Sequence, residues 1–268
     1  MSRLRLTVRG RDAGGEGRLL RLVNEDDRPA RAGNTVPEAR VTGMFDSIAP
    51  VYDRINTLMT GGLDGRWRRA AVKAARLARG GRALDVACGT GKLTAALGRA
   101  VGPTGSVIGV DLSPMMLSEA RRAVGDVPGV EFVLGNALAL PVEDGSFDAA
   151  TIAFGLRNLA SFEDGFREMA RAVRSGGRVV CLELSVPRSR LLGRFYAGVF
   201  GVTAPAMGAI FRRRAEYSYL PHSLDDFPTA ENIAATMQRA GLRDVKFRRL
   251  AFGAAALHVG TVTGPTQP

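Results

Sequence analysis

The sequence is short of cysteine and of long apolar runs, and each shortage removes a class of protein. It has only two cysteines, Cys88 and Cys181, which lie far apart in apolar stretches. This count excludes a disulfide framework and favours buried free thiols in a reducing compartment. No apolar run approaches the about 18 residues that cross a bilayer, and the N-terminus has no apolar segment before a small-residue cleavage site. We therefore expect a cytoplasmic protein.

Lysine is also scarce, although the formal net charge is +11. Lys73, Lys92 and Lys246 are the only lysines, so arginine supplies nearly all of the positive charge. Such a charge raises the hypothesis of a nucleic-acid-binding or RNA-modifying protein. A composition rich in Arg, Ala and Gly also reflects a GC-rich genome, and no nucleic-acid-binding module is recognisable. We therefore expect no nucleic-acid partner.

Catalytic motifs of other enzyme classes are missing as well. No cluster of His, Cys and Asp has the spacing of metal ligands, and no nucleophile elbow occurs, so we expect no metal site. The length of 268 residues suits one substantial α/β core. Residues 1–40 are rich in Arg, Gly, Asp and Glu with little periodicity, which is typical of a flexible tail. We expect one domain over residues 41–262 and a short tail over 263–268.

Within that domain, strands and helices alternate. Two helices, at 49–59 and 65–78, are predicted first. Five short apolar runs follow as expected strands: 83–88, 107–110, 130–134, 147–154 and 178–184. Helices are expected between them, at 93–101, from Ser113-Pro114 onward, and from a capping box at Ser161 to Gly176-Gly177. Strands that are apolar throughout indicate a doubly wound, Rossmann-like parallel sheet covered on both faces.

The C-terminal part has a different pattern. A helix at 230–240 precedes two strands at 245–250 and 254–262, whose connection, Ala251-Phe252-Gly253, is short enough for an antiparallel hairpin. The predicted fold is therefore α/β, with a mostly parallel sheet that ends in a C-terminal antiparallel hairpin. Residues 188–228 are predicted to form an insertion that caps the substrate.

Three strand ends carry groups suited to a nucleoside ligand, which binds at the carboxyl ends of strands in open α/β sheets. The first, DVACGTG, runs from Asp85 through Gly89 and Thr90 to Gly91, and its glycines let the backbone approach a ligand. The second ends at Asp111, an acid placed to accept the ribose hydroxyls. The third is Asn136-Ala137, where an amide and a backbone N–H can meet an adenine edge.

The spacing favours S-adenosyl-L-methionine over a nicotinamide dinucleotide. A dinucleotide motif needs a glycine three residues after Gly91, where Thr94 stands. Simpler interpretations of the acids stay open. Asp85 could be a turn-forming acid bonded to loop amides, and Asp111 could be an acid that caps the next helix.

At this point the chain resembles the ubiquinone/menaquinone biosynthesis C-methyltransferase family, across about residues 41–262. The likeness is carried by MFDSIA with YDRIN at 44–56, by 84–94, by FGLRN at 154–158, by 176–185 and by the ending ALHVG at 256–260. The resemblance implies a class I methyltransferase fold, S-adenosyl-L-methionine as cofactor, and methylation of a ring carbon in a polyprenylated quinol.

The resemblance also implies particular cofactor contacts. It points to Thr90, Asp111 and Asn136-Ala137, and we add Leu112 to the expected set. Ala153 stands where many members have Ser, which leaves only a backbone contact there. Other departures bear on the substrate: Ile55 replaces Met, Thr60 replaces Ser, Asp64 replaces His and His222 replaces Glu.

The expected chemistry is an in-line methyl transfer to a ring carbon activated by loss of the neighbouring hydroxyl proton. We expect Arg157 to stabilise the phenolate, with Asn158 beside it; a simple ion pair is the other interpretation of Arg157. His222 and His258 are the only histidines and are candidate bases, or else structural residues. Tyr52 and Asp53 are expected on a lid helix over the cofactor, unless Tyr52 only packs there. Trp67 is expected in the core.

A basic, apolar segment at 188–214 suggests contact with an anionic membrane. It holds six arginines, no acid, and several aromatic and aliphatic residues between them. An ordinary pair of cap helices with a solvated basic face is the other interpretation. We thus consider a peripheral location at the inner face of the cell membrane, a lipophilic quinol substrate, and a homodimer as an open association state.

Three alternatives to quinol methylation remain at this stage. A GC-rich composition favours demethylmenaquinol over a demethylated ubiquinol precursor. The altered positions Asp64 and His222 leave room for methylation of another small molecule in specialised metabolism. A regulatory protein that binds the cofactor without turnover, and the nucleic-acid-related function suggested by charge, complete the set.

Overall fold

The computed structural model describes residues 4–7, 21–24, 32–185 and 227–264 of the chain. The expected membrane segment at 188–214, nearly all of the cap insertion, and His222 therefore lie outside the described residues. Near the N-terminus, β1 (Leu4–Thr7) and β2 (Arg21–Asn24) form an antiparallel pair, where the sequence predicted a tail without strands.

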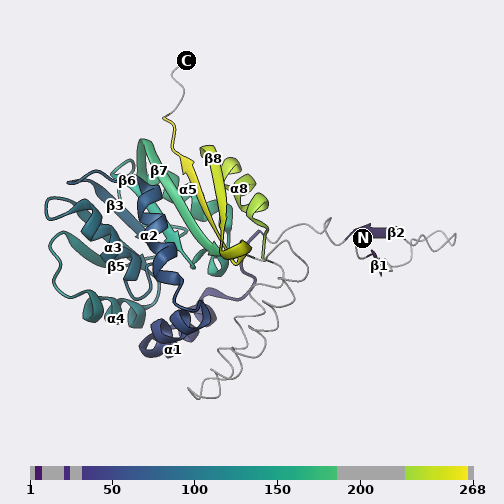
Figure 1. Cartoon of the computed structure of the whole chain (residues 1–268), viewed down its shortest axis with the longest axis horizontal. Helices are drawn as coiled ribbons and strands as arrows, with labels where there is room; N and C mark the ends of the chain where they lie inside the picture. Colours follow the sequence, from purple (N-terminus) through teal and green to yellow (C-terminus); the bar gives the residue numbers. More distant parts are fainter. Residues whose placement is uncertain (1–3, 8–20, 25–31, 186–226, 265–268) are drawn as a thin grey trace.

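The central feature is a seven-stranded sheet in the order β5-β4-β3-β6-β7-β9-β8 (Figure 1). Its strands are β3 (Arg82–Val86), β4 (Ser106–Asp111), β5 (Val130–Leu134), β6 (Phe147–Ala153), β7 (Val173–Leu184), β8 (Arg243–Leu250) and β9 (Ala255–Thr261). The first five run parallel, and β9 is antiparallel to both β7 and β8. The predicted fold is confirmed. Strand order reverses between β3 and β6, which is where such sheets bind ligands.

The helices cover both faces of the sheet. They are α1 (Glu38–Met59), α2 (Asp64–Ala75), α3 (Lys92–Val101), α4 (Pro114–Val124), α5 (Phe162–Ala172) and α8 (Ala230–Arg239), with short 3₁₀ turns η2 (Leu156–Asn158) and η3 (Ala251–Gly253). Among the described residues, no helix combines the length and apolarity needed to cross a bilayer.

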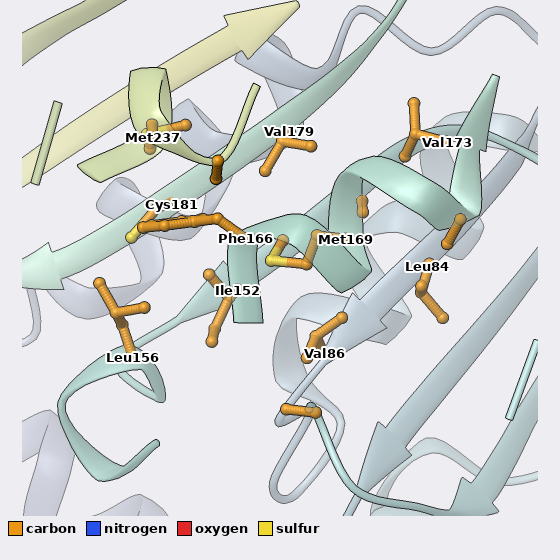
Figure 2. Packing of buried hydrophobic residues seen from close by; sticks show 14 of the residues in the cluster. Leu84, Val86, Ile152, Leu156, Phe166, Met169, Val173, Val179, Cys181 and Met237 are labelled. Carbon is orange, nitrogen blue, oxygen red and sulfur yellow. The ribbon is translucent and has the colours of Figure 1, made fainter. Parts of the chain in front are cut away.

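Two buried clusters, one on each face, hold these layers together. On one face, Phe166 and Met169 of α5 and Met237 of α8 pack on Val86 and Ile152 of the sheet (Figure 2). On the other face, residues of α2 and α3 pack on alternate strand residues, and Trp67 belongs to that cluster as expected. Because successive side chains of a strand point to opposite faces, each strand contributes residues to the clusters on both faces of the sheet. The sheet is thus buried on both sides, so its ends are where ligands can reach it.

Element boundaries differ from the prediction in two places. Helix α1 begins at Glu38, well before the expected start at residue 49, and it continues through Pro50. The stretch before it also belongs to the domain, because the backbone N–H of Asn34 donates to Leu159 O (2.6 Å). Helix α5 starts at the predicted cap, Ser161, but ends at Ala172, since β7 already begins at Val173.

Candidate active site

A pocket with an empty volume of about 740 Å³, its mouth included, lies at the carboxyl ends of the parallel strands. Eight of the residues expected from the sequence line it: Tyr52, Gly89, Asp111, Leu112, Asn136, Ala137, Ala153 and Asn158. A smaller polar pocket of about 310 Å³ adjoins it, and Tyr52, Ala87, Gly89 and Ala153 line both.

The loop after β3 has the backbone conformation that the glycines predicted. Gly89 and Gly91 have φ values of 54° and 78°, a region that favours glycine. A Cβ on Gly91 would lie 2.8 Å from the ring of Phe132, so only glycine fits there. Ala87 also adopts a positive φ of 52° without being glycine. Such backbone strain costs about 1–3 kcal/mol and concentrates at functional sites.

Asp111 is oriented by two backbone amides. Its Oδ2 accepts from Gly89 N (2.8 Å) and its Oδ1 accepts from Ser113 N (2.9 Å), which ties the end of β4 to the glycine loop. Burial raises the pKa of this carboxyl, while the amide bonds oppose the shift. A carboxylate has about four acceptor positions, so this carboxyl keeps acceptor capacity for a ribose. The helix-cap interpretation is wrong, because Ser113 Oγ accepts from Met116 N and caps α4.

Asp85 lines the smaller pocket and is almost fully buried. It accepts hydrogen bonds from Thr94 Oγ1 (2.6 Å) and Thr151 Oγ1 (2.9 Å). The donors in both bonds are thus side-chain hydroxyls, not the loop amides considered from the sequence. Burial raises the pKa of Asp85 to about 6, against the hydroxyl bonds and the charge of Arg68. A bound ammonium group beside it would favour the charged form.

Two cations in the smaller pocket were not predicted. The guanidinium of Arg68 pairs with Asp64 (2.5 Å) and lies 5.1 Å from the centre of the Phe154 ring. Lys92 Nζ lies 3.4 Å from Asp53 Oδ1. With Asp85, they give this pocket one acid and two cations, which suits the zwitterionic end of an amino acid. The pocket position of Arg68 could not be predicted from the sequence, because nothing distinguishes it there from the many other arginines.

Helix α1 forms a lid over the larger pocket. Glu38, Val41, Phe45 and Tyr52 line it, and their spacing places them on one face of the helix. Phe45 and Tyr52 also contact each other edge to face, with ring centres 5.9 Å apart. The expected lid helix and the place of Tyr52 on it agree with this arrangement.

Three carboxylates of α1 connect the lid to the three strand-end loops. Asp53 Oδ1 accepts from Thr90 Oγ1 (2.7 Å), and Asp46 Oδ1 accepts from Ser113 Oγ (2.5 Å). Glu38 accepts from Asn136 Nδ2 through both oxygens (3.2 and 3.3 Å). Glu38 and Asp46 were missed because the helix was expected to start at residue 49. A spacing of eight and seven residues between the three acids is the signal that could have found them.

The side chain of Arg157 does not line either pocket, although it follows β6 as expected. It is buried and forms an ion pair with Glu183, with Nη1 2.5 Å from Oε1. Glu183 also accepts from the backbone N–H groups of Arg157 (3.2 Å) and Leu184 (2.9 Å). The ion-pair interpretation of Arg157 is the observed one. Asn158, the next residue, does line the larger pocket.

His258 is not placed to act as a base. It is buried on β9, and its Nε2 lies 2.9 Å from Ala230 O. Burial lowers its pKa, and its ring lies against Phe247. It lines neither pocket, so the expectation that it is catalytic is corrected to a structural role. Within the described ranges, no group of three or more His, Cys, Asp or Glu is arranged to hold a metal.

Comparison with known proteins matches most of the chain to one family. The model of the ubiE/COQ5 methyltransferase family matches residues 34–262. The chain belongs to this family. It is 41% identical to "Ubiquinone/menaquinone biosynthesis C-methyltransferase UbiE" of Geobacter sulfurreducens over 82% of this chain and 88% of that protein. It is 38% identical to "Demethylmenaquinone methyltransferase" of Staphylococcus aureus over 85% and 95%.

Solved structures of other methyltransferases share the fold of this ubiE/COQ5 family member. A putative methyltransferase in complex with the Haloferax volcanii Trm112 activator has a TM-score of 0.62 at 20% identity, over 85% of this chain and all of that one. A SAM-dependent methyltransferase from Thermotoga maritima has a TM-score of 0.58 at 22% identity, over 83% and 99%. The predicted enzyme class, a methyltransferase that uses S-adenosyl-L-methionine, is confirmed.

Proposed function

We propose that this methyltransferase transfers a methyl group to a ring carbon of a lipid-tailed quinol, with demethylmenaquinol as the leading substrate. Two observations support the substrate class: the family of the chain and the names of its relatives, one of which covers ubiquinone as well as menaquinone biosynthesis. The observation that carries the proposal is the match over residues 34–262, which spans the lid, the strand ends and the pocket together.

The two pockets suit the two ends of S-adenosyl-L-methionine. Asp111 would accept the ribose hydroxyls, and the wall made by Leu112, Asn136 and Ala137 would hold the adenine. Asp85 would bind the ammonium group, with Arg68 and Lys92 beside the carboxylate. Because Tyr52 and Gly89 line both pockets, the junction between the two is where the reacting centre of the donor would sit.

The cofactor, when bound, supplies an electrophilic methyl group on a sulfonium. The protein must then hold the quinol ring in line, keep water out and stabilise the phenolate. Asn158 lines the pocket and is the candidate for a hydrogen bond to the ring oxygen. Arg157 would act as a positioning residue, because its ion pair with Glu183 anchors the turn that carries Asn158.

The proton of the quinol hydroxyl needs an acceptor other than His258, which is buried away from both pockets. A water molecule at the mouth of the larger pocket, away from the reacting carbon, would take the proton, and its loss leaves the negative charge on the ring oxygen. In this scheme the protein does not need a dedicated base, only groups that make the phenolate more stable.

Association with an anionic membrane surface remains part of the proposal, as does the cytoplasmic side of that membrane as its location. Its support is the run of six arginines and no acids at 188–214, together with a substrate that carries a lipid tail. We expect pelleting with vesicles that contain anionic lipid to exceed pelleting with neutral vesicles. Equal pelleting would contradict this part. The association state, including a homodimer, stays a prediction.

One labelling experiment tests the function. The protein is incubated with methyl-labelled S-adenosyl-L-methionine and either short-chain demethylmenaquinol, a short-chain demethylated ubiquinol precursor, or bulk RNA. We expect label in the menaquinol product and none in RNA. Label only in the ubiquinol-type product would correct the substrate, and binding of the cofactor without any labelling would contradict the proposal.

A further inference from the structure

We propose that Glu38 selects the cofactor by its base, accepting a hydrogen bond from the 6-amino group of adenine and excluding a 6-oxo base. The inference rests on the proposed cofactor site and adds a specificity residue on the lid helix.

The first step is that the side chain of Asn136 is already engaged. Its Oδ1 accepts from the backbone N–H of Leu138 (2.9 Å), and its Nδ2 points to Glu38. The amide is therefore fixed in one orientation, with its donor side facing the lid. The N–H₂ group of Asn136 is bound to the carboxylate of Glu38. The hydrogen-bonding character of this wall of the pocket is therefore set by Glu38.

The second step is where Glu38 lies. It lines the larger pocket together with Leu112, Ala137 and Leu159, and its side chain is half-buried. Asp111 ends the neighbouring strand of the sheet, and neighbouring strands are about 4.8 Å apart. A ribose held by Asp111 would thus have its base directed toward the loop after β5, which is the part of the pocket that Glu38 closes.

Glu38 has acceptor capacity beyond its bond with Asn136. A carboxylate offers about four acceptor positions and no donor. The amide of Asn136 donates one N–H₂ group to Glu38, which leaves positions for a second amino group. Adenine carries such a group at position 6, whereas hypoxanthine carries a carbonyl oxygen there. A carboxylate would bind the first through a charge-assisted bond and repel the second.

The other acids of α1 do not compete for this role. Asp46 accepts from the hydroxyl of Ser113, and Asp53 accepts from the hydroxyl of Thr90. Asp53 is not among the residues of the larger pocket, nor is Asp46. Glu38 is the acid of this helix that both lines the pocket and faces an amide donor.

The test compares two ligands in binding, so it does not depend on turnover. S-adenosyl-L-homocysteine and its 6-oxo analogue, S-inosyl-L-homocysteine, are titrated calorimetrically into the wild type, Glu38→Gln and Glu131→Gln. Glu131 is the matched control, an exposed acid on β5 that does not line the pocket. Thermal melting of each variant checks that it is folded.

We expect the wild type and Glu131→Gln to bind the adenosyl ligand at least tenfold more tightly than the inosyl ligand. In Glu38→Gln the ratio should fall below threefold, because a glutamine amide can donate to the 6-oxo group as well as accept from the 6-amino group. A wild type without preference, or a Glu38→Gln variant that keeps the full preference, would overturn the inference. A wild type that binds neither ligand would instead refute the cofactor site itself.

Discussion

Both halves of the sheet hold ionisable groups that are buried or partly buried, but the two halves use them differently. In the half formed by β5, β4 and β3, the acids Asp85 and Asp111 line pockets and accept bonds from hydroxyls and backbone amides. In the half formed by β6, β7, β9 and β8, Glu183 and His258 are each 1% exposed and line neither pocket. Their bonds go to other groups of the protein.

This difference shows that burial of an ionisable group does not by itself mark a site. Asp85 and Asp111 each line a pocket, and the donors to them are side-chain hydroxyls in the first case and backbone amides in the second. Glu183 has its oxygens occupied by a guanidinium and by two backbone amides. The acids of the first half are available to a ligand, whereas Glu183 in the second half holds the turn beside the pocket.

The largest effect is expected from breaking the ion pair of Arg157 and Glu183. Arg157→Met leaves a buried carboxylate without its cation, which should cost about 3–5 kcal/mol of unfolding free energy. The double variant Arg157→Met with Glu183→Leu should recover much of that loss, since no buried charge remains. Urea denaturation of the three proteins measures both quantities.

The same variants decide whether Arg157 acts directly on the substrate. If Arg157 only positions its neighbours, the folded variant Arg157→Met with Glu183→Leu should bind S-adenosyl-L-homocysteine with nearly unchanged affinity. If Arg157→Met were as stable as the wild type yet had lost labelling activity, the guanidinium would have to contact the substrate, and the contrast between the two halves would be wrong at this residue.

A second test uses the pH dependence of stability. Burial raises the pKa of Asp85 from 3.8 in the unfolded chain to about 6, so the folded protein holds this proton more tightly. This group therefore adds stability below about pH 4 that is lost as the pH rises through about 6, a difference of about 3 kcal/mol. We expect Asp85→Asn to be more stable than the wild type at pH 7.5 but not at pH 4.

Urea denaturation at both pH values measures the difference, and Asp126→Asn, an exposed acid after α4, is the control. The cost of Asp85→Asn should appear in binding, because the ammonium end of the cofactor loses its carboxylate. A variant that is less stable than the wild type at pH 7.5 would show that the carboxylate stabilises the fold, as Glu183 does, and the two halves would then be alike.

Replacing Asp111 should have an effect nearly as large as that at Asp85, but on the free energy of ligand binding. Asp111→Ala removes the acceptors for two ribose hydroxyls, and each hydrogen bond to a charged group contributes about 1.5–3 kcal/mol. We expect affinity for S-adenosyl-L-homocysteine to fall at least about hundredfold in calorimetry. Asp126→Ala should leave it unchanged. A loss below tenfold would mean that Asp111 only fastens the glycine loop to β4.

The sequence predicted the binding half better than the other half, and the reason is physical. Asp85, Gly89, Gly91 and Asp111 take their places from local rules: strand ends meet at one edge of the sheet, and glycines permit positive φ. Arg157 has a partner 26 positions later in the chain, and that pairing depends on the register of β6 against β7. Local pattern could not reveal which of its two interpretations was correct.

The start of the lid helix α1 was predicted wrongly for another reason. A helix was expected from residue 49, whereas α1 begins at Glu38 and includes Pro50 in its interior. Packing of Val41, Ile48 and Ile55 in α1 continues the helix through the proline instead. Glu38 was thereby placed in a tail and left out of the site. Tertiary contacts decided this boundary, and they are not visible in a single sequence.

The smallest effect is expected at the contact between lid and glycine loop, and it tests whether the binding half also depends on α1. Thr90→Val removes the hydroxyl that donates to the carboxylate of Asp53, a partly buried bond of about 1.5 kcal/mol. We expect the affinity for S-adenosyl-L-homocysteine to fall about tenfold, through faster dissociation in stopped-flow measurements, because the lid is held by one bond fewer. The control variant Ser146→Ala removes an exposed hydroxyl that donates to Glu143 O. It should change neither the affinity nor the dissociation rate. An unchanged dissociation rate in Thr90→Val would show that the bonds of Asp46 and Glu38 to the other loops hold the lid without help from Asp53.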